Sequence, residues 1–143
     1  MSKSVLCAVD INETGQEVQV LERAAQLAVL DGASLDVVTV VPDFGSSMVA
    51  GFFEAHHHEK AVKHVSQELH KFVENILGAE NAKNVRHIVS TGKAYEEILK
   101  VARETTPELI VLGAHKPDLK DYLLGPNAAR VVRFAKSSVY VVR

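Results

Sequence analysis

The segment "ELIVLGAHKPDLKDYLLGPNAARVV", residues 108–132, decides the fold. It begins with a short apolar run, which is typical of a strand covered on both faces. It ends with a predicted helix that starts at Pro126, because proline fits the first helical position, where its missing N–H costs little. Gly113 and Gly125 bound the loop between the two. A strand, a loop and a helix in this order form one unit of an α/β protein.

The same alternation continues along the whole chain. Thr14 and Glu17 have the spacing of a capping box at the start of the first helix, and Gly32 is placed to end it. Strands are predicted at 4–9, 35–41, 85–89, 108–113 and 138–142, and the other helices at 59–77, 94–104 and 126–135. We therefore expect one α/β domain over 1–143, with a doubly wound, five-stranded parallel sheet and helices on both faces.

The composition argues against several classes of partner. Of the 143 residues, 47% are hydrophobic and 24% charged, and the net charge is −2. This charge gives no electrostatic reason to expect nucleic acid as a partner. No apolar run approaches the ~20 residues that span a bilayer. The single cysteine, Cys7, lies in an apolar run and is expected to be a buried thiol. We expect a cytoplasmic protein.

In open parallel sheets, ligands bind beyond the carboxyl ends of the strands, where the strand order reverses. Three loops leave from that edge: 10–13, the segment that starts at Pro42, and 113–125. The second, 42–57, shows no clear period, and connections of this length are usually mobile or functional. We expect the ligand among these loops, with 42–57 as the surface that changes on binding.

The loop after the fourth strand has the chemistry of an anion site. With Gly125 at the N-cap and Pro126 at the first helical position, the N–H groups from Asn127 onward point out of the helix end. His115 and Lys116 add donors or charge. An ordinary strand-to-helix connection needs the same glycine and proline, and on residue chemistry alone that interpretation is favoured. Neither a P-loop nor a G-x-G-x-x-G motif is present.

The order of elements and this loop together resemble the universal stress protein family. Its nucleotide-binding members carry G-x-x-G-x₉-G-[ST] between the fourth strand and the fourth helix. Gly113 and Gly125 match the first and last glycines, and "YLLGPNAARVV" is similar to the family's "LLLGS-x-A-x-x-V". The first strand's Val9-Asp10, "VTVV" in the second strand and the C-terminal "SVYVV" extend the resemblance over essentially the whole chain.

The resemblance implies binding of ATP, or of AMP or ADP, with a role of Mg²⁺ left open. Asp10 would accept a hydrogen bond from a ribose hydroxyl, Val40 would face the adenine through its backbone, and Gly125 would help to hold the phosphates. The expected binding residues are Ala8, Val9, Asp10, Val40, Leu112, Gly113, His115, Lys116, Gly125, Pro126 and Asn127.

The chain departs from the family motif at three points, which keeps a second interpretation open. Lys116 replaces the middle glycine, Pro126 replaces the Ser/Thr, and the loop is one residue shorter. A nucleotide-free interaction module with the same fold would tolerate these changes. Gly113 and Gly125 count against it, since a lost site needs neither. A slow Mg²⁺-dependent ATPase that uses Asp10 is the third interpretation.

The apolar strand 138–142 ends the chain, so nothing in the sequence covers its outer edge. Pairing with the same strand of a second copy would satisfy that edge, and the resemblance implies such a homodimer. We therefore expect a homodimeric stress-response protein that binds ATP with little or no turnover and acts on an unidentified downstream protein.

No catalytic or metal-binding residues are expected. The chain lacks the G-x-S-x-G turn that carries the nucleophile in serine hydrolases. The run His56, His57, His58 suggests a metal site. A pair of histidines that binds zinc from one helix is normally three or four positions apart, and no two of these residues, His64 and His70 have that spacing.

Overall fold

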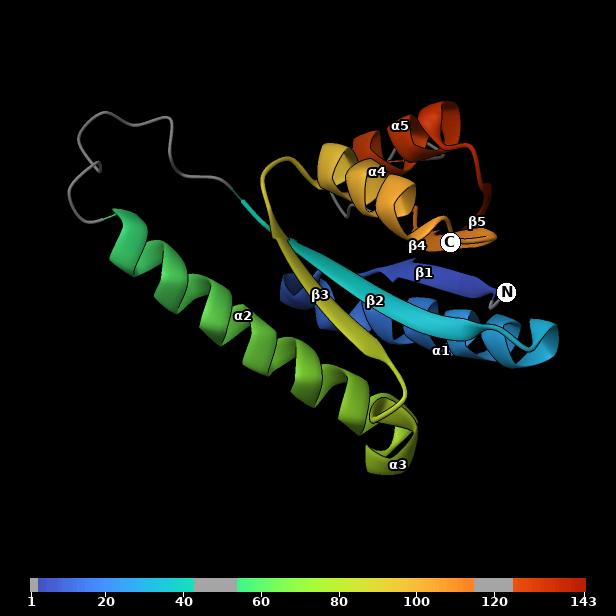
Figure 1. The fold of residues 1–143 in the computed structure, drawn as a ribbon, viewed down its shortest axis with the longest axis horizontal. Helices are drawn as coiled ribbons and strands as arrows, with labels where there is room; N and C mark the ends of the chain where they lie inside the picture. Colours follow the sequence, from blue (N-terminus) through green and yellow to red (C-terminus); the bar gives the residue numbers. More distant parts are fainter. Residues whose placement is uncertain (1–2, 43–53, 115–124) are drawn as a thin grey trace.

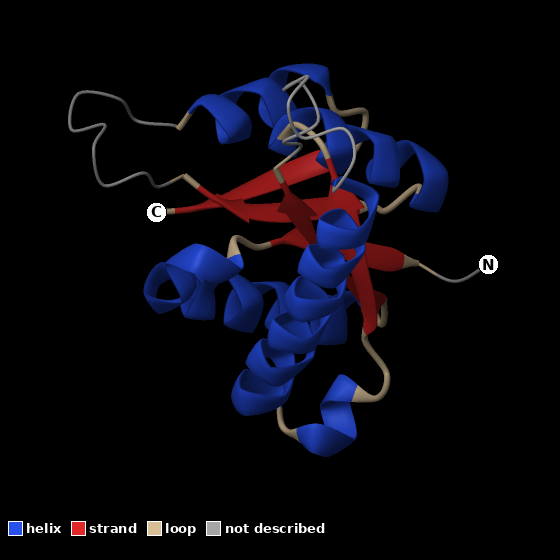
Figure 2. Ribbon diagram, turned by 90° about the vertical axis from the view of Figure 1, so that its left-hand side faces the viewer, coloured by secondary structure: helices blue, strands red, loops and turns tan. Residues whose placement is uncertain are grey.

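The computed structural model describes residues 3–42, 54–114 and 125–143, without side-chain detail at 13, 14 and 54–57. A five-stranded sheet lies between two helical layers (Figures 1 and 2). Helices α1 (Thr14–Asp31) and α2 (Glu54–Leu77) cover one face, and α4 (Ala94–Thr105) and α5 (Pro126–Phe134) cover the other.

All strands of the sheet run parallel, in the order β3-β2-β1-β4-β5. They are β1 (Ser4–Ala8), β2 (Ser34–Val41), β3 (Arg86–Thr91), β4 (Leu109–Gly113) and β5 (Ser138–Val142). The predicted α/β class and parallel sheet are confirmed. The order reverses between β1 and β4, because the chain moves outward through β2 and β3 before it returns to β4. The loops after β1 and β4 therefore lead to helices on opposite faces of the sheet, which leaves a crevice between the two strand ends.

The start of α2 differs from the prediction. The helix begins at Glu54 rather than at 59, so 54–57 are helical and not part of an irregular segment. The prediction relied on apolar spacing, which begins only at Val62, and the polar first turns carry no such signal. Residues 43–53 of the predicted segment lie outside the described residues.

Three smaller differences follow from tertiary pairing or short length. Strand β3 continues beyond 89, because Ser90 and Thr91 pair with Val40 and Val41 of β2. The one-turn helix α3 (Ala79–Ala82) and the 3₁₀ turn η1 (Ile11–Glu13) are too short to leave a periodic pattern in the sequence.

Alternate side chains of the strands form two cores, one on each face of the sheet. Val5, Cys7, Val37 and Val111 pack against α1 and α2, whereas Leu6, Val38 and Ile110 pack against α4 and α5. Burial of each such side chain stabilises the fold by roughly 1.5–3 kcal/mol relative to exposure. A one-residue slip would exchange the two sets, so the register of each strand is fixed.

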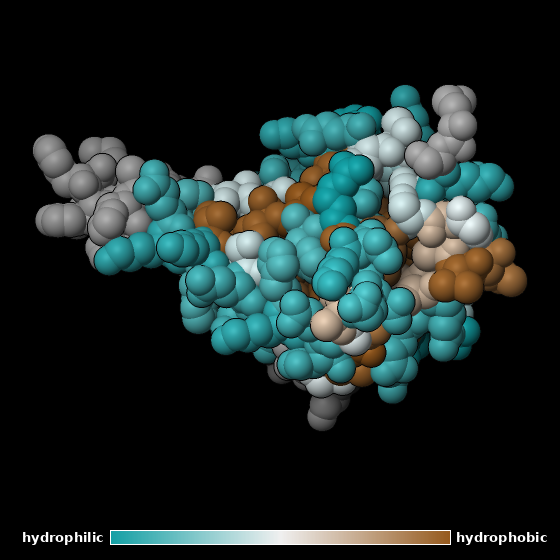
Figure 3. All heavy atoms as spheres, turned by 60° about the horizontal axis from the view of Figure 1, so that its bottom comes forward, coloured by the Kyte–Doolittle hydropathy of each residue, from teal (hydrophilic) through white to brown (hydrophobic). Residues whose placement is uncertain are grey.

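The expected burial of Cys7 is confirmed, since its side chain is fully buried. Burial raises the pKa of the thiol, and the nearby Glu17 carboxylate raises it further. On the outside, the α1 and α2 side of the molecule is largely hydrophilic (Figure 3). None of the described helices is long and apolar enough to cross a membrane.

Candidate functional site

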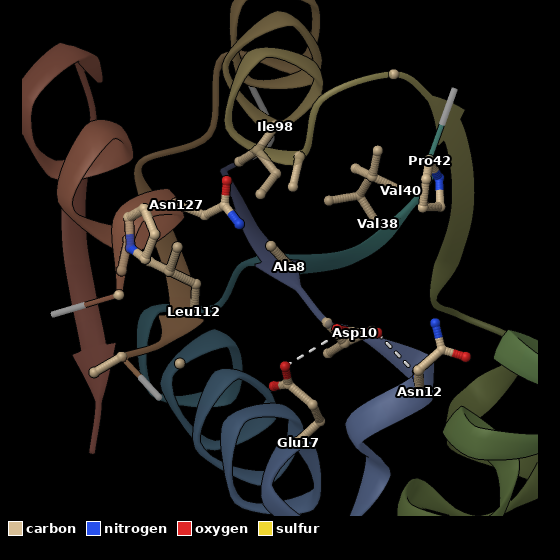
Figure 4. A pocket seen from close by; sticks show the side chains of 18 residues that line it. Ala8, Asp10, Asn12, Glu17, Val38, Val40, Pro42, Ile98, Leu112 and Asn127 are labelled. Atoms are coloured by element: carbon tan, nitrogen blue, oxygen red, sulfur yellow. Dashed lines mark hydrogen bonds between the residues drawn. The ribbon is translucent and has the colours of Figure 1, made fainter. Parts of the chain in front are cut away.

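A cavity of about 470 Å³ opens at the carboxyl ends of β1, β2 and β4 (Figure 4). Its wall also includes the loop after β3 and the first residues of α4 and α5. Two of the predicted binding residues, His115 and Lys116, lie outside the described residues. The other nine line this cavity: Ala8, Val9, Asp10, Val40, Leu112, Gly113, Gly125, Pro126 and Asn127.

One part of the cavity wall is apolar. Val38, Val40 and Pro42 come from β2 and the residue after it, and Ile98 comes from α4 on the far side (Figure 4). Ile98 and Val38 belong to the second core, so both are held rigidly. This part of the wall suits the flat, apolar faces of an aromatic ring system.

A second part of the wall is acidic. The Asp10 carboxylate accepts the N–H of Asn12 through Oδ1 (2.9 Å), and this bond turns the chain into η1. The Glu17 carboxylate accepts the N–H of Asp10 through Oε1 (3.1 Å; Figure 4). This bond ties Glu17, and with it the first turn of α1, to the end of β1. The side chain of Thr14, the other member of the predicted capping box, lies outside the described side chains, so the capping box stays a prediction.

Three of the described helices, α1, α4 and α5, have residues of their first turn in the cavity wall. The first turn of α1 contains Glu17 and that of α4 contains Glu96 and Glu97, whereas α5 has no acidic residue there. A helix N-terminus carries roughly half a positive charge, which acidic side chains in the first turn offset. Of these three helices, α5 therefore offers the most favourable place for an anion.

The backbone of α5 is arranged for an anion beyond its first residue. Gly125, the N-cap residue, has an ordinary φ of −68°, and its N–H donates to the Ala114 carbonyl (2.7 Å). Pro126 has no N–H. The next two N–H groups, those of Asn127 and Ala128, have no acceptor within the helix. Both residues line the cavity. Asn127 also turns its side-chain amide toward the cavity (Figure 4).

Gly113 has a packing role besides its place in the cavity wall. A Cβ atom there would lie 3.3 Å from Cγ2 of Val20 in α1 and 3.7 Å from Oε2 of Glu17. The glycine therefore lets α1 approach β4 closely. Its presence does not by itself distinguish a nucleotide site from a module that has lost one.

Sequence reasoning missed the loop after β3, although its position could have been inferred. Strand β3 is parallel to the others, so its carboxyl end lies at the same edge, and Gly92 follows it directly. Val38 also had a signal, because it lies two residues before Val40 on the same face of a strand. Glu17 had none, since its reach to Asp10 depends on how α1 packs. The lining residues absent from the prediction are Asn12, Glu17, Val38, Pro42, Gly92, Ala94, Ile98, Ala114 and Ala128.

Three of the histidines whose side chains are described, His58, His70 and His87, contact other parts of the chain. His58 Nε2 lies 3.1 Å from the Thr91 hydroxyl, and the rings of His70 and His87 stack with centroids 3.9 Å apart. Among the described residues, no three His, Cys, Asp or Glu side chains are grouped so that they could hold a metal ion.

Comparison with known proteins gives matches over the full length of the chain. A model described as the universal stress protein family matches residues 1–143. Universal stress protein G of Shigella flexneri is 26% identical over 144 residues, covering 100% of both chains.

Two of the similar solved structures contain nucleotides. The universal stress protein from Archaeoglobus fulgidus in complex with dAMP is 21% identical, with a TM-score of 0.64, over 100% of this chain and 98% of that one. A universal stress protein in complex with cAMP is 20% identical, with a TM-score of 0.65, over 99% and 97%. At these identities, the likeness shows a shared fold.

Proposed function

Because the chain belongs to the universal stress protein family, we propose that its cavity binds an adenine nucleotide, ATP, ADP or AMP, and that binding with little or no turnover regulates a stress response in the cytoplasm. The observation that carries this proposal is the division of the cavity wall. An apolar part lies on the β2 and α4 side, and the N-terminus of α5, without acidic residues, lies at the other end.

Each part of a nucleotide has a matching part of the wall. The adenine would lie against Val38, Val40 and Ile98, with its polar edge toward the backbone of β2. The phosphate would lie at the N–H groups of Asn127 and Ala128, where the helix dipole favours negative charge. The base and phosphate would then be at opposite ends, as in a nucleotide bound in an extended form.

The ribose would lie between these ends, beside Ala8, Leu112 and Gly113. Asp10 would accept a ribose hydroxyl through its carboxylate, which the Asn12 N–H holds in place through Oδ1. This bond favours a positioning role for Asp10 over that of a catalytic base, in agreement with little or no turnover. The complexes of two family members with dAMP and cAMP support an adenine nucleotide as the ligand.

We also propose that the protein is a homodimer formed through β5. This strand is at an edge of the sheet, and Tyr140 in it is 39% exposed. Pairing with the β5 strand of a second copy would satisfy the outward N–H and C=O groups. A dimer also provides a surface on which occupancy of the two cavities can be reported to a downstream protein.

The first experiment is mass spectrometry of small molecules released when freshly purified protein is denatured. We expect AMP, ADP or ATP in a stoichiometric amount. Protein that releases none is then tested for a thermal shift with millimolar AMP and ATP, each with and without Mg²⁺. No released nucleotide and no shift would contradict the proposal and leave the nucleotide-free interaction module as the better interpretation, with Pro126 as its cause.

A further inference from the structure

The Glu17 carboxylate lies in the gap that opens where the chain leaves β1. Just beyond this strand, the N–H of Val9 still donates to the Val38 carbonyl of β2 (2.9 Å). Successive N–H groups of an extended chain point to opposite sides, so the N–H of Asp10 points toward β4. Its acceptor there is Oε1 of Glu17, 3.1 Å away (Figure 4). A side chain of α1 thus takes the place of a strand carbonyl where the strand order reverses.

The same carboxylate lies close to the end of β4. Oε2 of Glu17 is 3.7 Å from the position that a Cβ atom of Gly113 would take. Glu17, Asp10 and Gly113 all line the cavity. One side chain from the first turn of α1 therefore reaches the ends of both strands that flank the crevice.

Asp10 depends on this support, because it lies beyond the last residue of β1 and is exposed. The bond from the Asn12 N–H to Oδ1 of Asp10 (2.9 Å) fixes the carboxylate relative to the turn η1. The bond to Glu17 in turn fixes Asp10 relative to α1, which the buried Val20 and Leu21 anchor in the core. The place of the Asp10 carboxylate in the cavity is therefore set by both bonds together.

We infer that Glu17 is a positioning residue: by accepting the Asp10 N–H, it holds the Asp10 carboxylate at the ribose part of the cavity. It thereby sets how strongly the site distinguishes ligands by their ribose hydroxyls. The inference rests on the proposed function and deepens it, since Asp10 is the proposed acceptor of a ribose hydroxyl. Such a hydrogen bond weakens steeply when its geometry is lost. Glu17 acts through Asp10 and not on the base or the phosphate.

The test is a ratio of two affinities. AMP and 2′,3′-dideoxy-AMP have the same base and phosphate and differ only in the ribose hydroxyls, so other contacts cancel in the ratio. Calorimetric titration of the full chain measures both affinities. We expect the wild type to bind AMP at least tenfold more tightly, because a hydrogen bond to a charged group is worth about tenfold or more. Asp10→Ala should reduce this preference to less than threefold.

Glu17→Met and Glu17→Gln form the matched pair of variants. Both introduce an uncharged side chain of similar length, but only glutamine keeps an oxygen that readily accepts the Asp10 N–H. We expect the preference for AMP to fall at least threefold in Glu17→Met and to stay within twofold of the wild type in Glu17→Gln. Glu22→Met on the same helix is the control and should leave the ratio unchanged, because Glu22 is exposed and does not line the cavity.

A merely structural role of Glu17 would weaken binding of both ligands alike and leave their ratio unchanged. In the Asp10→Ala background, Glu17→Met should have no further effect on the ratio, because the two residues act as one unit. Glu17→Asp keeps the charge but is one methylene shorter, so it should lose the preference as Glu17→Met does. It also serves as the test if the methionine variant does not fold.

A wild-type ratio near one, or a wild-type preference that persists in Glu17→Met and Glu17→Asp, would overturn the inference. Binding of AMP in the same titrations would leave the proposed function intact. No binding of either ligand to the wild type would instead contradict the proposed function.

Discussion

At the scale of single residues, Asn127 gives the most direct test of where the phosphate lies. Asn127→Asp places a carboxylate at the N-terminus of α5, where it repels a phosphate and yet stabilises the helix by about 0.3–1 kcal/mol. We expect the affinity for AMP to fall at least tenfold and that for adenosine to stay unchanged, measured by calorimetry.

The matched control is Ala129→Asp, since Ala129 is exposed and does not line the cavity. It adds the same charge to the first turns of the same helix. A similar loss of AMP affinity in both variants would mean that the phosphate senses only the overall charge and does not contact the helix end.

The backbone conformation at position 92 favours glycine. Its φ is +142°, and a Cβ atom there would lie 3.1 Å from Cγ of Glu97. We expect Gly92→Ala to lower the free energy of unfolding by about 1–3 kcal/mol, because alanine is strained in that conformation. Urea unfolding followed by circular dichroism measures the change.

Gly15 provides the comparison for Gly92. It lies in α1 without positive φ, and apart from its chain neighbours and the helix's own backbone no atom lies within 4 Å of the position its Cβ would take. Gly15→Ala should leave the free energy of unfolding unchanged or raise it by up to about 1 kcal/mol. If both variants lose stability equally, the strain argument for Gly92 is wrong.

At the scale of elements, a pair of stacked histidines joins α2 to β3. Burial lowers the pKa of His87, the neighbouring His70 lowers it further, and Glu74 partly opposes them. Above pH 6.5, His87 is neutral in both the folded and the unfolded chain, so its full contribution to stability is present. As the pH falls below 6.5, the unfolded chain binds a proton first, and stability is lost until the pH passes the folded pKa.

His87→Phe should therefore reduce the loss of stability between pH 7.5 and pH 5. Phenylalanine keeps a ring against His70 but cannot be protonated. His64→Phe is the control, because His64 is exposed on α2, the helix that carries His70. Urea midpoints at the two pH values measure the effect. The same pH dependence in the wild type and in His87→Phe would contradict the linkage to His87.

At the scale of the whole molecule, the exposed edge of β5 predicts the oligomeric state. The Val142 carbonyl accepts from Ala114 on the β4 side, so the N–H and C=O of Val141 point outward. Val141→Pro removes an outward donor, whereas Val141→Ala keeps it and loses similar side-chain contacts. We expect sedimentation velocity to show a dimer for the wild type and Val141→Ala and a monomer for Val141→Pro.

A monomeric wild type at micromolar concentration would contradict the homodimer. A Val141→Pro variant that stays dimeric would instead mean that the copies associate through another surface. Both outcomes are independent of ligand affinity. Either one would contradict the proposed dimer without contradicting the proposed nucleotide site.

The sequence by itself determined the element types and the layers of the fold. Short apolar runs and helical spacing are local properties, because they depend only on which side of each element is buried. The family resemblance also pointed to nine residues that line the cavity, five of them at the ends of β4 and α5 around Gly113 and Gly125. The polar start of α2 was missed for the same reason, since it carries no apolar signal.

The tertiary structure alone decided which side chains share the cavity and which charges face it. Glu17 reaches Asp10, and Gly92 joins the cavity wall, only because the sheet places the ends of four separate strands at one edge. The stacking of His70 on His87 likewise depends on how α2 crosses β3. These contacts join residues distant in sequence, and the packing that creates them arises from strand order and register, which no local pattern encodes.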